Sequence, residues 1–179
     1  MDSTQQKEEQ HFICFAYGSN MLIKKLRSRC PSAEKIGMCK IKKHVLKFHK
    51  VSKKDHSGKC DCEFTESETA EVYGVLFRIP KSEETLLDEF EGLGKGYEKI
   101  KIPVTTIEEG KDTAVMYCAT DEAKDPNKKP YVWYLNQVIE GAKENCLPDD
   151  YIAKIRKVVA DEDPDRARHA TEAALYNGI

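Results

Sequence analysis

Two short segments of the sequence carry groups suited to catalysis. The first is FAYGSN at residues 15–20, where an apolar run ends at Gly18 and Ser19 or Asn20 can cap a following helix. A strand that turns directly into a helix aims several unpaired backbone N–H groups at one place, which attracts an anion or a polarised carbonyl. The alternative is an ordinary tight turn with a helix cap, and the turn taken alone favours that alternative.

The second segment is DEFEGLGKGY at residues 88–97, in which Glu91 closes a predicted helix. The buried face of that helix is expected to consist of Leu86, Leu87 and Phe90. Asp88 and Glu89 then point outward, whereas Glu91 lies at the edge of the buried face in the last turn. The helix dipole and partial desolvation disfavour an ionised carboxylate there, which suits a proton shuttle. The competing interpretation is a boundary glutamate that reaches water.

Other catalytic patterns are missing from the sequence. It contains no nucleotide-binding glycine loop, no zinc-protease motif and no hydrolase elbow. Cys60 and Cys62 lack a second Cys or His pair at zinc-finger spacing, so we expect no metal site. None of the five scattered histidines is expected to be catalytic.

Composition limits the class of protein. The chain has 179 residues, 34% of them charged, with a formal net charge of -2, which suits one globular domain that binds neither nucleic acid nor membrane. Its seven cysteines are irregularly spaced, which favours a reducing cytoplasm over a disulfide framework. Residues 1–10 are polar where a signal peptide would be apolar, and we expect a flexible tail there.

Hydrophobic periodicity predicts strands before helices. Strands are expected at 11–17, at 36–51 as one long or two shorter segments, at 72–80, and at 97–107 and 113–119 as a hairpin. Helices are expected from residue 19, at 82–91, 131–144, 149–159 and 165–176, with a polar loop at 52–59. This order predicts an α+β fold, a small mixed β-sheet or barrel with flanking helices. We expect one domain at 11–160 and a C-terminal helical extension at 161–179.

Four segments taken together resemble the gamma-glutamylcyclotransferase family. They are FAYGSNML at 15–22, VYGVLFRIP at 72–80, DEFEGLGKGY at 88–97 and YLNQVIEGAKENCLPDDYI at 134–152, and they occur in the family's order over about residues 12–152. The tail after about residue 160 carries no family motif.

The resemblance implies a set of site residues. It makes Glu91 the catalytic proton acceptor and donor, and Tyr97 a supporting residue. The family's substrate-binding residues map onto Cys14, Phe15, Ala16, Tyr17, Gly18, Ser19 and Tyr134. It further implies a small mixed β-barrel, a homodimer, and no metal or organic cofactor.

The implied reaction is an amide cyclisation of the transferase or lyase type, as in glutathione metabolism. The α-amine of a gamma-glutamyl amino acid or amine attacks its own γ-carbonyl, releasing 5-oxoproline and the free amine. Two alternatives stay open at this point. One is a non-catalytic module that binds an acidic small ligand, and the other is an antibiotic-tailoring relative that removes a gamma-glutamyl group.

Overall fold

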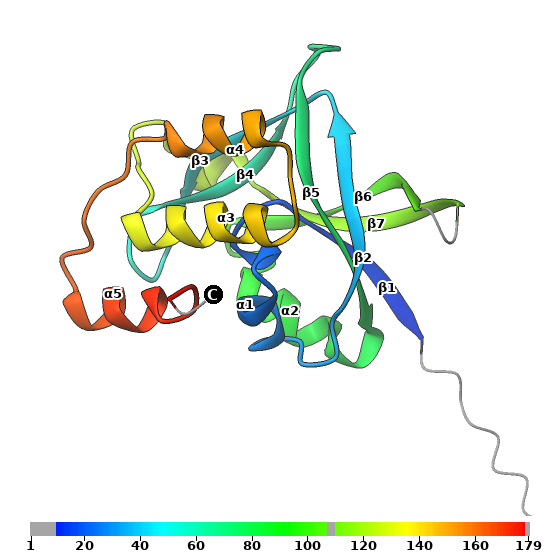
Figure 1. The fold of residues 1–179 in the computed structure, drawn as a ribbon, viewed down its shortest axis with the longest axis horizontal. Coiled ribbons are helices and arrows are strands. Elements are labelled where there is room, and N and C mark those ends of the chain that lie inside the picture. Colours follow the sequence, from blue (N-terminus) through cyan, green and yellow to red (C-terminus); the bar gives the residue numbers. More distant parts are fainter. Residues whose placement is uncertain (1–9, 107–109, 178–179) are drawn as a thin grey trace, which may run out of the picture.

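A five-stranded mixed sheet forms the centre of the molecule. The computed structural model describes residues 10–106 and 110–177. The strand order is β2-β5-β1-β7-β6. Their bounds are β1 His11–Ala16, β2 Glu34–Lys42, β5 Glu71–Pro80, β6 Tyr97–Thr106 and β7 Gly110–Ala119. Strand β1 lies in the middle of this sheet (Figure 1).

Strand β1 is the central strand of the sheet. It pairs antiparallel with β5 and parallel with β7, so both of its edges are hydrogen-bonded. A strand that is buried between two neighbours is usually apolar along most of its length. The segment at 11–16, HFICFA, has this composition. Phe15 and Phe77 are almost fully buried where β1 and β5 run side by side. The end of β1 is thereby fixed in space, and the turn that follows it starts from a rigid position.

Strands β3 and β4, His44–Val51 and Gly58–Phe64, form a second, two-stranded sheet. The predicted segment 36–51 is therefore two strands, β2 and β3, separated at Lys43 with a left-handed φ of 59°. Strand β4 was missed, and the loop predicted at 52–59 is wrong at its end, because β4 begins at Gly58. The hairpin lies against β7, where Asp61 Oδ1 accepts a hydrogen bond from the Ala119 amide at 2.7 Å.

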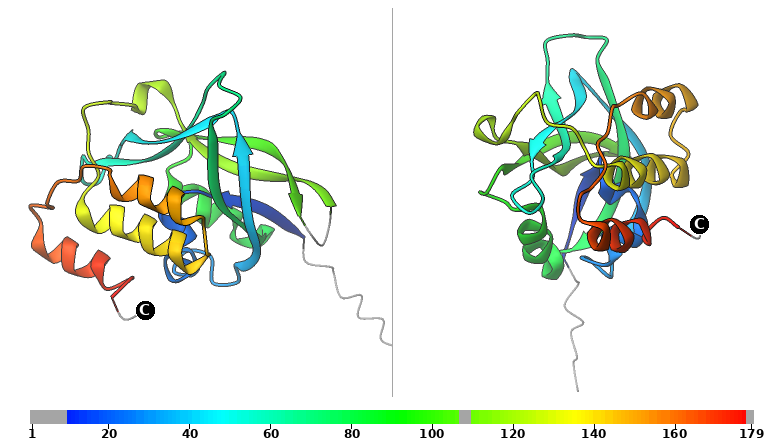
Figure 2. Two further views of the ribbon diagram at one scale, coloured as in Figure 1. Left: turned by 45° about the horizontal axis from the view of Figure 1, so that its top comes forward. Right: turned by 90° about the vertical axis from the view of Figure 1, so that its left-hand side faces the viewer.

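The α+β fold class is confirmed, and the two sheets of the described chain form no closed barrel. The helices are α1 Ile23–Arg27, α2 Glu84–Glu91, α3 Val132–Glu144, α4 Asp149–Arg156 and α5 Arg166–Ala173. Helix α3 lies between α4 and α5 (Figure 2). No helix in the described ranges is long and apolar enough to span a membrane.

Three local predictions about helices are wrong. Ser19 and Asn20 do not cap a helix with their side chains; they lie inside a short 3₁₀ turn, Ser19–Met21, which precedes α1. On α2, Leu87 alone is buried, while Leu86 and Phe90 are 46% and 47% exposed. Asp88 was expected to point outward, but its carboxylate accepts a hydrogen bond from the Tyr117 hydroxyl at 2.5 Å.

The structure describes most of the C-terminal segment but little of the N-terminal tail. The tail predicted at 1–10 lies outside the described residues except for Gln10, as does most of the hairpin turn between β6 and β7. The C-terminal segment packs against α3, where the indole of Trp133 donates to Asp163 at 2.7 Å. Arg168 of α5 holds the same carboxylate with two further hydrogen bonds.

Leu87 is expected to anchor α2 to the sheet. Leu87→Ala should lower the free energy of unfolding by about 2–5 kcal/mol, because it removes a fully buried side chain and leaves a cavity. The matched variant Leu86→Ala should cost less than about 1 kcal/mol, since that side chain is half exposed. Urea unfolding of both variants measures the difference, and equal losses would contradict this packing of α2.

Candidate functional site

Glu91 is the last residue of α2, and a sharp stop in the helix sets its direction. Gly92 follows it with a left-handed φ of 71°, which favours glycine, and the Leu93 amide bonds back to the Asp88 carbonyl at 2.9 Å. The Glu91 side chain is 15% exposed and faces the turn after β1. Its Oε1 atom accepts a hydrogen bond from Asn20 Nδ2 at 2.5 Å.

Arg29 completes this contact. Its NH1 atom lies 3.1 Å from Glu91 Oε1 and donates to Asn20 Oδ1 at 2.9 Å, while the guanidinium covers the ring of Phe90. A cation and an amide donor both stabilise the negative charge of a carboxylate. Arg29 was not identified from the sequence as a partner of Glu91. The only available signal was the basic run KKLRSR at 24–29.

The predicted substrate-binding segment lies beside Glu91. The residues assigned from the sequence, Cys14, Phe15, Ala16, Tyr17, Gly18, Ser19 and Tyr134, all line one cavity of about 370 Å³, and so does Glu91. The backbone amides of Gly18, Ser19 and Asn20 donate no hydrogen bond within the described ranges. These three N–H groups therefore have no partner among the described residues, and the residues that carry them line the cavity.

Cys60 of β4 holds two of the cavity's tyrosines through its backbone. Its amide donates to the Tyr134 hydroxyl at 3.0 Å, and its carbonyl accepts from the Tyr97 hydroxyl at 2.6 Å. Burial raises the pKa of both phenols well above the usual value, so both stay protonated at neutral pH. The second sheet, which the sequence analysis only half predicted, thus fixes the position of two predicted site residues.

Gly18 packs closely against this part of β4. A Cβ atom at Gly18 would lie 2.9 Å from Cys60 Cβ and 3.4 Å from the Tyr134 hydroxyl, so a side chain there displaces the cavity wall. The position requires glycine because of this close approach.

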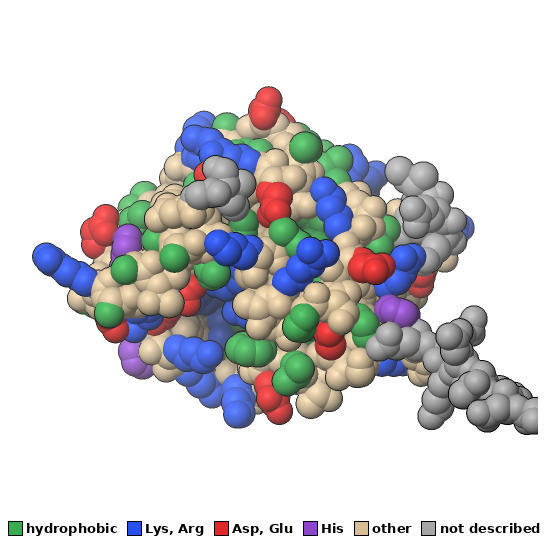
Figure 3. All heavy atoms as spheres, turned by 60° about the horizontal axis from the view of Figure 1, so that its bottom comes forward, with side chains coloured by type: hydrophobic (Ala, Val, Ile, Leu, Met, Phe, Trp, Pro, Cys, Tyr) green, Lys and Arg blue, Asp and Glu red, His purple; other side chains and the backbone are tan. Residues whose placement is uncertain are grey.

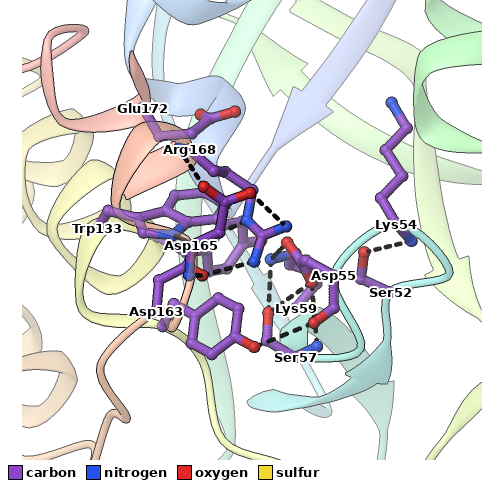
Figure 4. Close-up of polar contacts among 12 residues, drawn as sticks. Ser52, Lys54, Asp55, Ser57, Lys59, Trp133, Asp163, Asp165, Arg168 and Glu172 are labelled. Atoms are coloured by element: carbon purple, nitrogen blue, oxygen red, sulfur yellow. Dashed lines mark hydrogen bonds and ion pairs between the residues drawn. The ribbon is translucent and has the colours of Figure 1, made fainter. Parts of the chain in front are cut away.

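Charged side chains from the β3–β4 hairpin and α5 form the outer wall of the cavity (Figure 4). Lys59 donates to Asp55 at 2.8 Å and to Ser57 at 2.7 Å, and its ammonium lies 4.5 Å from the ring centre of Trp133. Glu172 of α5 accepts from Gln137 Nε2 at 2.8 Å. Eight Lys and Arg residues line the cavity against four Asp and Glu residues, and basic side chains surround a hollow in Figure 3.

A second group of polar residues lies away from this cavity. His49, Asp61 and Glu63 bring their ligand atoms within 4.8 Å of one another on the β3–β4 hairpin. The Lys124 ammonium lies 3.8 Å from Asp61 and 3.7 Å from Glu63, and it offsets part of their negative charge. Cys60 and Cys62, the pair considered for metal binding, are buried free cysteines.

Comparisons with known proteins agree on one family. The AIG2-like family model matches residues 71–155. A gamma-glutamylcyclotransferase of Mus musculus is 34% identical over 177 residues, covering 96% of this chain and 92% of the relative. The Homo sapiens gamma-glutamylcyclotransferase is 32% identical over 176 residues, covering 96% and 91%. A solved gamma-glutamyl cyclotransferase structure superposes with a TM-score of 0.82 at 28% identity, covering 94% of this chain and all of that one.

Thiol reactivity provides a test of the site's packing. Burial raises the pKa of Cys30 to about 11 and of Cys60 and Cys118 to about 12, whereas Cys146 is exposed. At pH 8 we expect a thiol-disulfide reagent to modify Cys146 first, because thiolates react and buried thiols do not ionise. In denaturant all seven cysteines should react. A fast phase that survives in Cys146→Ser, or fewer than seven thiols after unfolding, would contradict this description.

Proposed function

The chain belongs to the gamma-glutamylcyclotransferase family, and on this premise we propose that Glu91 catalyses ring closure of a gamma-glutamyl compound bound in the 370 Å³ cavity. The protein is an enzyme, a gamma-glutamylcyclotransferase that acts on a small molecule. One observation supports the residue assignment: Glu91 and the turn at 18–20, whose backbone amides donate to no described group, line the same cavity.

The reaction needs little from the protein beyond geometry and proton transfer. The substrate's α-amine attacks its own γ-carbonyl carbon, a carbon–nitrogen bond forms, and a five-membered ring closes. Glu91 takes a proton from the attacking nitrogen and returns it to the nitrogen of the departing amine, whose bond to the carbonyl carbon breaks. The products are 5-oxoproline and the free amine. Holding reacting groups in this geometry is equivalent to an effective molarity of about 10⁵–10⁸ M.

The surroundings of Glu91 suit the role of a base. Asn20 and Arg29 both contact the Oε1 atom of Glu91 and thereby orient its carboxylate. The amides of Gly18, Ser19 and Asn20 bind a substrate carboxylate or the oxyanion that develops on the γ-carbonyl oxygen. Tyr97 and Tyr134, protonated and held by Cys60, also line the cavity.

Further features of the proposal follow from the family. The enzyme works without a metal or organic cofactor, in the cytoplasm, as a homodimer, and supplies 5-oxoproline within glutathione metabolism. The non-catalytic binding module and the antibiotic-tailoring enzyme considered from the sequence gain no support from the relatives, which are named for the cyclotransferase activity.

Replacing Glu91 tests the proposed base. Glu91→Gln keeps the side-chain size but cannot accept a proton, so the rate of 5-oxoproline formation should fall by more than about 100-fold. Glu98→Gln makes the same change at an exposed position outside the cavity and should retain activity. Thermal unfolding confirms that both variants are folded. A folded Glu91→Gln protein with near wild-type turnover would disprove the assignment.

The turn is tested by two neighbouring substitutions. Gly18→Val should reduce kcat/KM more than Ser19→Ala, because its side chain displaces Cys60 and Tyr134 and moves several amides together. Ser19→Ala removes one hydroxyl, a hydrogen bond of about 0.5–1.5 kcal/mol. Both are measured on one gamma-glutamyl substrate, with melting curves as the folding control. If folded Gly18→Val is active while Ser19→Ala is inactive, the Ser19 hydroxyl and not the backbone binds substrate.

A further inference from the structure

Asp163, in the segment between α4 and α5, is a buried carboxylate whose two oxygens each accept two hydrogen bonds. Its side chain is 0% exposed. Oδ2 accepts from the indole nitrogen of Trp133 and from Arg168 Nε, both at 2.7 Å. Oδ1 accepts from Arg168 NH2 at 2.5 Å and from the Asp165 amide at 2.9 Å. The hydrogen bonds from Arg168 lower the pKa of Asp163 to about 2, so the carboxylate is charged at neutral pH.

The backbone holds the same segment beside the start of α3. The Asp161 amide donates to the Pro130 carbonyl at 2.9 Å, and the Val132 amide donates to the Asp161 carbonyl at 3.0 Å. These two bonds place the chain that precedes α5 next to the first turn of α3, which carries Trp133. The buried carboxylate two residues later then joins α3 to α5 (Figure 4).

Helix α5 has few apolar contacts that could hold it by themselves. Of its eight residues only Ala173 is buried. Near its C-terminal end, Gln137 Nε2 donates to the Glu172 carbonyl at 3.0 Å and to the Glu172 carboxylate at 2.8 Å. Its other end is held by the contact between Arg168 and Asp163. A helix of this length is unstable alone in water, so we expect loss of that contact to release α5 from α3.

Helix α5 closes one side of the catalytic cavity. Arg168 and Glu172 lie one helical turn apart, and both line the cavity together with Trp133. Figure 4 shows Arg168 beside Asp55 and Lys59, two further lining residues from the β3–β4 hairpin. Asp163 does not line the cavity. It can therefore affect the cavity only through the side chains that it holds.

We infer that Asp163 is a positioning residue of this enzyme, which fixes α5 against α3 and so keeps the outer wall of the catalytic cavity in place for substrate binding. The inference rests on the proposed function, which places the substrate in this cavity. It assigns the segment after residue 160, which carries no family motif, a part in the binding of substrate.

The first experiment compares Asp163→Asn with wild type on gamma-glutamyl-alanine. Asparagine has nearly the same size, but it has one acceptor oxygen and turns N–H donors toward the donors of Trp133 or Arg168. A wall that binds the ground state and the transition state equally changes KM alone, so we expect KM to rise tenfold or more and kcat to stay within threefold. Glu162→Gln makes the same change from carboxylate to amide at an exposed position outside the cavity, and both constants should stay within twofold.

The second experiment reads the contact without turnover. Trp133 is the single tryptophan of the chain and is 3% exposed, so intrinsic fluorescence reports on this place alone. Asp163→Asn should shift its emission to longer wavelength and raise the acrylamide quenching constant at least twofold, because release of α5 admits water to the indole. Glu162→Gln should leave both values unchanged.

A double variant tests whether Asp163 acts through Arg168. Residues that act through one contact have non-additive effects, so Asp163→Asn combined with Arg168→Met should raise KM no more than the larger of the two single changes. Arg168→Met removes the same contact from a partly exposed position, so it also tests the inference if Asp163→Asn does not fold. Effects that multiply in the double variant would overturn the inference.

Three other results would overturn it while the proposed function stands. One is a folded Asp163→Asn protein with wild-type KM, whether or not Trp133 becomes exposed. Another is a rise in KM while Trp133 stays protected, and the third is a loss confined to kcat. Failure of wild-type enzyme to form 5-oxoproline from gamma-glutamyl-alanine would instead contradict the proposed function, and the fluorescence of Trp133 does not depend on that result.

Discussion

The contact between Glu91 and the pair Asn20 and Arg29 connects the elements on which the site depends. It joins the end of α2 to the turn after β1 and to the residues that follow α1. A carboxylate at a helix C-terminus meets the negative end of the dipole, and here an arginine and an amide offset that cost. Leu87 holds α2 on the sheet and Gly92 ends it, so the carboxylate meets the turn at a fixed position.

The second sheet completes the cavity through main-chain groups. Cys60 uses both its N–H and its C=O to orient two tyrosine hydroxyls, so the path of β4 determines where these hydroxyls lie. Gly18 approaches the same residue closely, which brings the turn after β1 and the hairpin together. The reaction proposed here uses this arrangement, since ring closure within one substrate requires a shaped, partly closed space more than a strong nucleophile.

The sequence predicted the parts of the site that local pattern and family motif define. Glu91, the turn at 14–19 and Tyr134 could be named because they fall in recognisable segments, and the structure brings them to one cavity. Arg29 and Cys60 could not, because their importance arises from contacts between residues far apart in the chain. The same reasoning misplaced Asp88, whose partner Tyr117 belongs to a distant strand.

The central claim is that the substrate's own amine, and not water, attacks the γ-carbonyl. The most direct measurement is the reaction of wild-type enzyme with a gamma-glutamyl amino acid in water enriched in ¹⁸O, with the products analysed by mass spectrometry. The account predicts 5-oxoproline and the free amino acid in equal amounts, with no ¹⁸O incorporated into 5-oxoproline. Glutamate carrying one ¹⁸O atom as the primary product would contradict it and make the protein a hydrolase.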